Sequence, residues 1–551
     1  MGLEQTPGTC STTDLPPKSS NHDPPAKYSE GWRLSALVIA LGLAIFLVAI
    51  DMTIVSTAIP SISSEFHSIA SDGWYGSAFF LTNAATQAPC GKLYQFFPLK
   101  RCFVALMVIF EIGSLICALA QRPATLIIGR ALAGAGAAGV SVGAYTILAV
   151  SAAPRLRPAL TAIFGVSYAV ASFAGPLLGG LFTTSSTWRW CFWINLPVGG
   201  FTLGTVLLLV PARASSAPES TSWRSILKQV DILGAILIIG AMLCYLLALE
   251  WGGVLKPWND PDVIGTLIGY GTIGLLFCLH EWYLGDSAMI PRTLITQKPV
   301  LMSCGVIFFL ASSFFILLYY LPLYFQVMQG LSATGSGVRT VPLVLGCGVL
   351  SALSGVYMSI IGYGMPPMLL GSAATAIACG VFTMMDQHSD AGFWIGLQVL
   401  AGVGVGIACQ VPVMVNQASV EPSKLSSVTA ITLFFQMTGG SMFLQLAQSL
   451  LSNSLASYLS DHEDPSGGHV DHMAVLHAGA SDLSKKFDPE TLAIVVEAYM
   501  SGFRSTLFLA TALASVATIF ACFTGLGSIN KEPRSGTPEM EALGSSESVE
   551  R

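Results

Sequence analysis

The feature that most constrains this sequence is a series of apolar stretches, each long enough to cross a lipid bilayer. A transmembrane helix needs about 20 mostly apolar residues, and such stretches recur from Arg33 to Gly527. Only 10% of the 551 residues are charged, whereas about a quarter are charged in a typical soluble protein. We therefore predict an all-α membrane protein with fourteen spans: 33–57, 73–96, 101–120, 124–149, 157–183, 188–211, 231–251, 263–284, 300–327, 335–360, 366–386, 391–414, 425–452 and 503–527.

The distribution of Lys and Arg predicts the orientation of the chain. An even number of spans puts both ends on one side, and basic residues concentrate in the tails and in the loops on that side, which is typical of the cytoplasmic face. We expect disordered cytoplasmic tails over 1–32 and 528–551 and an outward connection over 453–502. Within that connection, Asp488 and Pro489 predict the cap and first residue of a short amphipathic helix.

Composition also argues against several functions. The formal net charge of -6 gives no basic surface for nucleic acid, and the twelve Cys are scattered singly, so we expect neither a metal site nor a disulfide framework. The sequence has no recognisable nucleophile and base pattern and no phosphate-binding Gly-Lys-Ser/Thr loop. We expect no enzymatic activity and no cofactor.

The fifth predicted span contains an unusual run, FAGPLLGG. Gly175, Gly179 and Gly180 leave room for a neighbouring helix to approach closely, and Pro176 predicts a kink in the helix axis. An ordinary close-packed helix pair would explain the same composition.

Four stretches, this run included, resemble signature motifs of the major facilitator superfamily, in particular its fourteen-span drug:proton antiporter branch. They are DMTIVSTAIP at the end of the first span, LIIGRALAGAGAAGV in the fourth, GVSYAVASFAGPLLGG in the fifth and WRWCFWINLPVGG at the start of the sixth. The resemblance implies the major facilitator fold, with six helices in 33–211, a cytoplasmic loop and two linking helices in 212–299, and six helices in 300–527. It also implies that span five meets the opposite bundle.

One loop matches the family only in part. The stretch GKLYQFFPLKR is similar to the cytoplasmic gate motif and retains Gly91, Lys100 and Arg101, but Gln95 replaces the family's Asp and Pro98 replaces its Gly. In the family that Asp latches the inward gate, so the resemblance implies a weaker latch or one made of hydrogen bonds.

Two ionisable residues inside the predicted spans are candidates for proton coupling. Asp51 lies toward the outer end of span one and Arg130 about two turns into span four, so the two lie at a similar depth. The resemblance implies a proton-responsive acid at Asp51 and a critical arginine at Arg130, while a static ion pair is the alternative. Glu111, in the middle of span three, would be either protonated or locally paired.

The same resemblance implies that spans one, four, nine and twelve line a central cavity. Aromatic and amide side chains suit a lipophilic, partly oxygenated molecule, and we predict as cavity residues Phe315, Tyr319, Tyr320, Tyr324, Gln410 and Gln436. Because few charged residues fall in these spans, the substrate is expected to be neutral or singly charged.

These features predict a proton-coupled exporter of drugs, toxins or secondary metabolites. A carrier for siderophores or basic amino acids and a non-transporting membrane sensor or scaffold are the alternatives. We expect a monomer whose partners are a small lipophilic substrate, protons and the bilayer, located in the plasma membrane or in a vacuolar or vesicle membrane.

Overall fold

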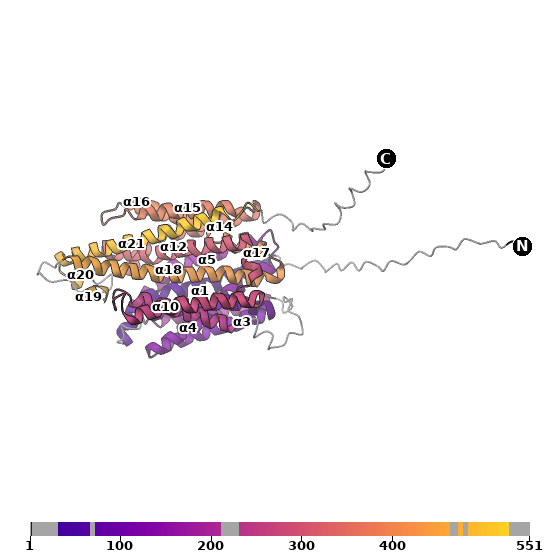
Figure 1. Cartoon of the computed structure of the whole chain (residues 1–551), viewed down its shortest axis with the longest axis horizontal. Coiled ribbons are helices and arrows are strands. Elements are labelled where there is room, and N and C mark those ends of the chain that lie inside the picture. Colours follow the sequence, from indigo (N-terminus) through magenta and orange to yellow (C-terminus); the bar gives the residue numbers. More distant parts are fainter. Residues whose placement is uncertain are drawn as a thin grey trace.

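Helices make up almost all of the chain that the structure describes (Figure 1). The structure is a computed structural model and describes residues 2, 31–66, 72–210, 231–462, 472–477 and 483–527. These ranges contain no β-strand, which confirms the all-helical prediction, whereas nearly all of the two predicted tails and residues 211–230 lie outside them. The long helices are α1 (Trp32–Phe66), α2 (Asp72–Phe96), α3 (Leu99–Ala118), α4 (Pro123–Ser151), α5 (Arg157–Ser185), α7 (Asn195–Leu209), α9 (Ile232–Trp251), α10 (Pro261–Leu284), α12 (Lys298–Gln329), α14 (Val341–Ile360), α15 (Met365–Phe382), α16 (Ala391–Ala408), α18 (Leu425–Asp461) and α21 (Pro489–Cys522).

Each predicted span has a helical counterpart in the structure. Within the described residues, 13 helical segments are long and apolar enough to cross a membrane. The one predicted span that is not among these 13 segments is 73–96, which corresponds to α2; this helix is 25 residues long and is less apolar, with Asn83, Gln87 and Lys92 among its residues. These three side chains are buried, so they lie within the protein and not against lipid.

Two of the spans are divided by proline. In the tenth span the short helix α13 (Ala333–Arg339) ends just before Pro342, and in the twelfth α16 is followed by α17 (Val411–Ala418), whose second residue is Pro412. Proline lacks an N–H group and its ring clashes with the carbonyl of the preceding turn, so it starts a helix more readily than it continues one. Gln410 lies at the second of these breaks. The sixth span is also divided, into α6 (Trp190–Trp193) and α7.

The long helices run roughly side by side, and the early and late parts of the chain occupy different regions of the molecule. In Figure 1, α3 and α4 lie below, while α14, α15, α16 and α21 lie above. Among the helices up to α7, α1 packs on α5 and α4 on α2 and α3; in the later part, α12 packs on α18 and α21, and α16 on α14 and α15. We call these two sets the N-terminal and C-terminal halves. They meet through α5 against α14 and α2 against α18, and the linking helices α9 and α10 pack on each other.

The helix expected within 453–502 differs from the prediction. Asp488 does cap a helix, accepting a hydrogen bond of 3.3 Å from the Thr491 amide, and Pro489 is its first residue. That helix is α21, which continues without interruption to Cys522, so the expectation of a separate short helix is wrong. A proline at the first position and Asp at the cap mark a helix start but carry no information about its length.

Candidate functional site

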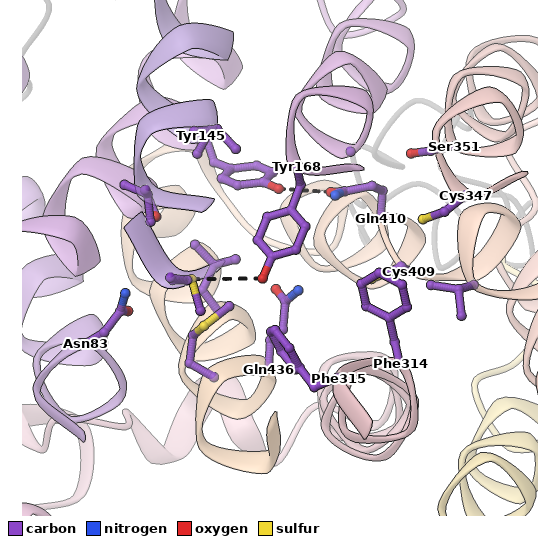
Figure 2. A pocket seen from close by; sticks show the side chains of 18 of the residues that line it. Asn83, Tyr145, Tyr168, Phe314, Phe315, Cys347, Ser351, Cys409, Gln410 and Gln436 are labelled. Atoms are coloured by element: carbon purple, nitrogen blue, oxygen red, sulfur yellow. Dashed lines mark hydrogen bonds between the residues drawn. The ribbon is translucent and has the colours of Figure 1, made fainter. Parts of the chain in front are cut away.

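A small cavity lies between the two halves (Figure 2). Its volume is about 50 Å³, enough for a few water molecules and far below the 300–1,000 Å³ or so of small-molecule sites. A larger ligand therefore requires the halves to separate. The lining residues are Ile45, Val48, Met52, Asn83, Gln87, Ser141, Tyr145, Gly165, Tyr168, Phe314, Phe315, Cys347, Ser351, Val405, Gly406, Cys409, Gln410, Leu433, Gln436 and Met437.

The cavity wall is apolar with a few uncharged polar groups. No Asp, Glu, Lys, Arg or His is among the described residues that line it. Asn83 and Gln87 lie one turn apart on α2, and the Gln87 Nε2 donates a hydrogen bond of 2.9 Å to the Asn83 Oδ1. The second amide atoms, Asn83 Nδ2 and Gln87 Oε1, and the Ser351 hydroxyl are buried and have no partner within the described chain. Such groups are costly to bury alone, so a ligand that hydrogen-bonds to them would gain affinity.

Three of the six predicted cavity residues line the cavity. Phe315 contributes an aromatic wall, and Figure 2 shows Gln410 and Gln436 projecting toward the centre. Tyr319 lies just outside the lining, and its hydroxyl donates a hydrogen bond of 3.1 Å to the carbonyl of Met52. This bond connects α12 to α1 and therefore joins the two halves.

The other two predicted cavity residues are not in the cavity. The Tyr320 hydroxyl donates a hydrogen bond of 3.0 Å to Gln448 Oε1 of α18. Tyr324 packs its ring on Phe503 of α21, with a centroid separation of 4.9 Å. Both tyrosines therefore fill the core of the C-terminal half, and the prediction for them was wrong.

Asp51 and Arg130 form a buried ion pair next to the cavity but outside its lining. The Arg130 Nη1 bonds to the Asp51 Oδ2, and the exposed fractions of the two side chains are 1% for Arg130 and 0% for Asp51. The opposite carboxylate oxygen, Asp51 Oδ1, accepts a hydrogen bond of 2.9 Å from Asn195 Nδ2, which also donates to the Ser114 hydroxyl at 3.1 Å. Asp51 is absent from the cavity lining although its neighbour Met52 is part of it.

Arg130 is also held from other directions. Its Nε donates a hydrogen bond of 2.9 Å to the Tyr75 carbonyl, and its guanidinium carbon lies 4.4 Å from the centre of the Phe79 ring. A charged arginine without such partners would be very costly in the membrane. Together with the bond from Asn195 to Asp51, these contacts tie α1, α2, α4 and α7 together.

The predicted cytoplasmic gate is closed by close packing and neutral hydrogen bonds. A Cβ atom on Gly91 would overlap the Cβ of Ala430, so α2 and α18 touch there only because Gly91 has no side chain. The Ser427 hydroxyl donates a hydrogen bond of 3.2 Å to Gln95 Oε1. Gln95 therefore makes a hydrogen bond across the halves at the position of the family's Asp.

The two basic residues of the gate motif face elsewhere. Lys100 Nζ donates a hydrogen bond of 2.5 Å to the Leu207 carbonyl at the end of α7. Arg101 is exposed at the start of α3. Both residues belong to the N-terminal half, whereas Gln95 accepts the bond that crosses to α18.

The glycines of α5 face two different partners. A Cβ on Gly175 would overlap the Thr53 side chain, and one on Gly179 would overlap that of Thr57, so both glycines pack on α1 of the same half. For these two residues, the expectation of contact with the opposite bundle is wrong. Gly180, with Thr334 Oγ1 at 3.5 Å from its Cβ position, faces the C-terminal half.

Pro176 lies within α5, and the helix runs from Arg157 to Ser185 without a break. A proline inside a helix removes one backbone hydrogen bond. The helix is therefore not divided at this proline, in contrast to the spans that contain Pro342 and Pro412.

Sequence analysis missed several polar residues at the site. Asn83 and Gln87 form an amide pair four residues apart in a span, which was a usable signal because such residues share a helix face. Asn195 belongs to the quoted WINLP stretch, but its contact with Asp51 depends on how α7 packs against α1.

Comparison with known proteins agrees with this architecture. The family model described as Major Facilitator Superfamily matches residues 41–444. The proton:xylose symporter XylE, solved with 6-bromo-6-deoxy-D-glucose bound, superposes with a TM-score of 0.57 at 14% sequence identity, covering 88% of this chain and 94% of the XylE chain. At that identity the match shows the fold alone.

Relatives that match almost the full length include the following two. The MFS-type transporter GME11371 of Pestalotiopsis microspora is 38% identical over 509 residues, covering 92% of each chain. The aspyridones efflux protein of Neocamarosporium betae is 37% identical over 510 residues, covering 92% of this chain and 90% of that protein. With a family model matching most of its length and relatives of this similarity, the chain is a multi-pass membrane protein that belongs to the major facilitator superfamily.

Proposed function

We propose that this protein is a proton-coupled exporter of lipophilic, oxygenated small molecules without net charge. The observation that carries the proposal is the cavity between the halves, whose wall combines aromatic and aliphatic side chains with amide and hydroxyl groups and has no charged residue among those described. Apolar burial supplies affinity for such a ligand, and the unpartnered amides orient it. The full-length similarity to an aspyridones efflux protein supports export as the direction.

Proton coupling is assigned to Asp51 and Arg130. The pair is buried, is separate from the cavity lining and includes a residue of α1, the helix that also supplies Met52 to the cavity. Protonation of Asp51 would break the ion pair and free α1 from α4, so that a proton taken from outside can change how the halves pack. In this proposal the protein works as a monomer. Because export releases the substrate from the cell, the membrane is the plasma membrane.

Carriers for basic amino acids and for siderophores are less well supported. A basic amino acid needs a carboxylate in its site, and the described lining residues include none. A sensor that does not transport is also less well supported. The cavity wall contains polar atoms of Asn83 and Gln87 without a partner in the described chain, and such atoms are suited to bind a transported ligand.

The experiment is transport by the purified full chain in proteoliposomes with an imposed pH gradient. The panel contains neutral polyketide-like lipophiles, siderophores and basic amino acids, and proton flux is followed in the same vesicles with an entrapped pH dye. Wild type is compared with Asp51→Asn and with Asp390→Asn, a matched change of an exposed capping residue.

Gradient-driven movement of a neutral lipophile, with matching proton flux that Asp51→Asn abolishes and Asp390→Asn retains, supports the proposal. Movement of basic amino acids alone would replace the substrate class. Transport by Asp51→Asn at the wild-type rate under the same gradient would overturn the coupling role.

A further inference from the structure

Glu111 is a buried carboxyl group that the mechanism above does not use. It lies on α3, and both of its carboxyl oxygens are buried without a hydrogen-bond partner within the described chain. An ionised carboxylate without a partner is very costly in hydrocarbon. Of the two alternatives that the sequence left open, the absence of a hydrogen-bond partner in the described chain favours the protonated form over a local ion pair.

The space for this carboxyl group is provided by Gly199 of α7. A Cβ atom built on Gly199 would overlap Glu111 Oε1. The acid therefore lies directly against the α7 backbone, in a place that only glycine leaves free. This is an observation independent of the missing hydrogen bonds.

A second unpartnered atom lies one helical turn away. Asn195 precedes Gly199 by four residues on α7, and Ser114 follows Glu111 by three on α3, so each pair shares a helix face. Asn195 Nδ2 donates to both Asp51 and Ser114, but Asn195 Oδ1 is a buried acceptor without a partner within the described chain. A protonated carboxyl group is a donor, and it is the complement of this acceptor.

We propose that Glu111 is a second proton-binding site, which exchanges a proton with Asp51 across Asn195 and Ser114. This inference rests on the proposed proton coupling at Asp51. The exchange conserves charge: when Asp51 is ionised and paired with Arg130, Glu111 holds the proton, and when Asp51 takes the proton, Glu111 becomes the carboxylate.

The position of Glu111 gives this exchange a direction. Glu111 and Gly199 both lie one turn from Ser114 and Asn195, toward the predicted cytoplasmic ends of α3 and α7. None of these four residues lines the substrate cavity. The proton route therefore runs from Asp51 toward the cytoplasm without passing through the cavity.

The charged residues on the helices around Glu111 leave it without an evident counter-ion. Lys100 and Arg101 are at the start of its own helix, and α6 and α7 contribute no charged residue. On α4 the only charged residue is Arg130, which is paired with Asp51. Apart from Lys100 and Arg101 at the far end of α3, no described basic side chain on α3, α4, α6 or α7 is left to stabilise an ionised Glu111 while Asp51 is ionised.

The remaining titratable residues on these helices are distant in sequence or uncharged at neutral pH. On α2, Asp72 is the first residue, and Lys92 donates to the Asp286 carbonyl at 3.1 Å. The thiols and phenols on α2, α3, α4 and α6 are those of Tyr75, Cys90, Tyr94, Cys102, Cys117, Tyr145 and Cys191. Thiols and phenols carry no carboxyl group, so these residues do not contribute to the infrared band of a protonated carboxyl.

The test reads the Glu111 proton directly and needs no transported substrate. Infrared difference spectra of the purified full chain in lipid nanodiscs are recorded during a pH titration, in the region of the protonated carboxyl stretch. Wild type is compared with Glu111→Gln, which keeps the shape of the side chain, with Gly199→Ala, and with Glu421→Gln as a control at an exposed glutamate. Asp51→Asn tests the exchange.

A component of the protonated carboxyl band at neutral pH that Glu111→Gln removes and Glu421→Gln retains supports the site, and Gly199→Ala should shift the frequency of that component. Asp51→Asn should move the titration of this band by roughly one pH unit, the strength expected of a nearby unit charge. A wild-type spectrum without the band, or a band whose intensity is the same in wild type and in Glu111→Gln, overturns the proton site. A titration that Asp51→Asn leaves unchanged overturns the exchange. Because no transport is measured, these results stand apart from success or failure of the export assay.

Discussion

Tyr145 of α4 donates a hydrogen bond of 2.9 Å to Gln410 Oε1, and this bond joins the two halves at the wall of the cavity. Gln410 lies at the break between α16 and α17, where Pro412 is the second residue of the new helix. The Tyr145 ring is fixed by Phe164, with ring centroids 4.9 Å apart and an edge-to-face angle of 87°. The bond is therefore formed between a rigid donor and an acceptor at a break in a helix.

Replacing Tyr145 with Phe should favour separation of the halves. The change keeps the ring and leaves the buried Gln410 oxygen without its donor, at a cost of about 1–3 kcal/mol to the closed state. We expect alkylation of Cys409, which lines the cavity, to become roughly ten-fold faster by mass spectrometry of the labelled peptide, the factor that 1.4 kcal/mol or so would give. Tyr168→Phe is the control, because that hydroxyl contacts a weak acceptor, the Met52 sulfur, at 3.9 Å. Equal labelling of wild type and Tyr145→Phe would contradict this role.

Changing Asp51 to Asn should destabilise the fold because it leaves Arg130 as a buried charge without its counter-ion. Removing one partner of a buried pair costs about 3–5 kcal/mol. The double variant Asp51→Asn with Arg130→Gln should recover part of that loss but not proton-driven transport. Thermal unfolding in detergent measures the first effect, and an Asp51→Asn protein as stable as wild type would show that the pair is not held as described.

Adding a side chain at Gly179 should force α1 and α5 apart. A Cβ there would overlap the Thr57 side chain and would lie 2.8 Å from the Ile54 carbonyl, so Gly179→Ala should cost about 1–3 kcal/mol and Gly179→Leu more. Gly204→Ala on α7 is the matched control, since nothing lies within 4 Å of its Cβ position in the described chain. Membrane fractionation and thermal unfolding measure insertion and stability. Equal stability of the two alanine variants would argue against the close contact.

Removing the Ser427 hydroxyl should loosen the cytoplasmic gate. Its hydrogen bond to Gln95 is worth about 0.5–1.5 kcal/mol, so Ser427→Ala should make Cys90, the neighbour of Gly91, several-fold more reactive toward a thiol reagent. Gln95→Glu should have the opposite effect, because a carboxylate accepts a stronger bond from the same hydroxyl. Ser423→Ala, at an exposed serine, is the control. If both changes at Ser427 and Gln95 left Cys90 labelling unaltered, the bond would have no part in closure.

Acid should release a contact made by Glu65, which lies beyond the end of the first span. Arg189 donates to both carboxylate oxygens of Glu65, and Trp188 Nε1 donates to Oε2 at 2.6 Å. The Arg189 hydrogen bond holds the pKa of Glu65 below its usual 4.5. Because the folded-state pKa is lowered, the stabilisation is present above about pH 4.5 and is lost as pH falls through the lowered value. Tryptophan fluorescence should change over that acidic range in wild type but not in Glu65→Gln, and a transition that persists in the variant would assign it elsewhere.

The sequence predicted the pairing of Asp51 with Arg130 because depth in a membrane can be counted in residues along a helix. The prediction that Tyr320 and Tyr324 line the cavity failed because the sequence does not show whether an aromatic side chain points into the cavity or into the core of its own half. Helical spacing could have placed these two on one stripe of α12 and Phe315 with Tyr319 on another, since residues four apart share a face. Which stripe meets the cavity depends on packing against other helices, and a local pattern does not contain that information.

Asp51 and Met52 are consecutive residues on α1, and side chains one residue apart point about 100° away from each other. Asp51 is held by Arg130 and Asn195 on one side of the helix, while the Met52 carbonyl and sulfur receive the hydroxyls of Tyr319 and Tyr168 on the other. The first helix, α1, is therefore contacted at one level by polar groups on two of its sides. If Asp51 takes up a proton as we propose, any rotation of α1 that follows must also displace Met52 and the two hydroxyls that contact it, so the proton and the substrate need not share one binding site.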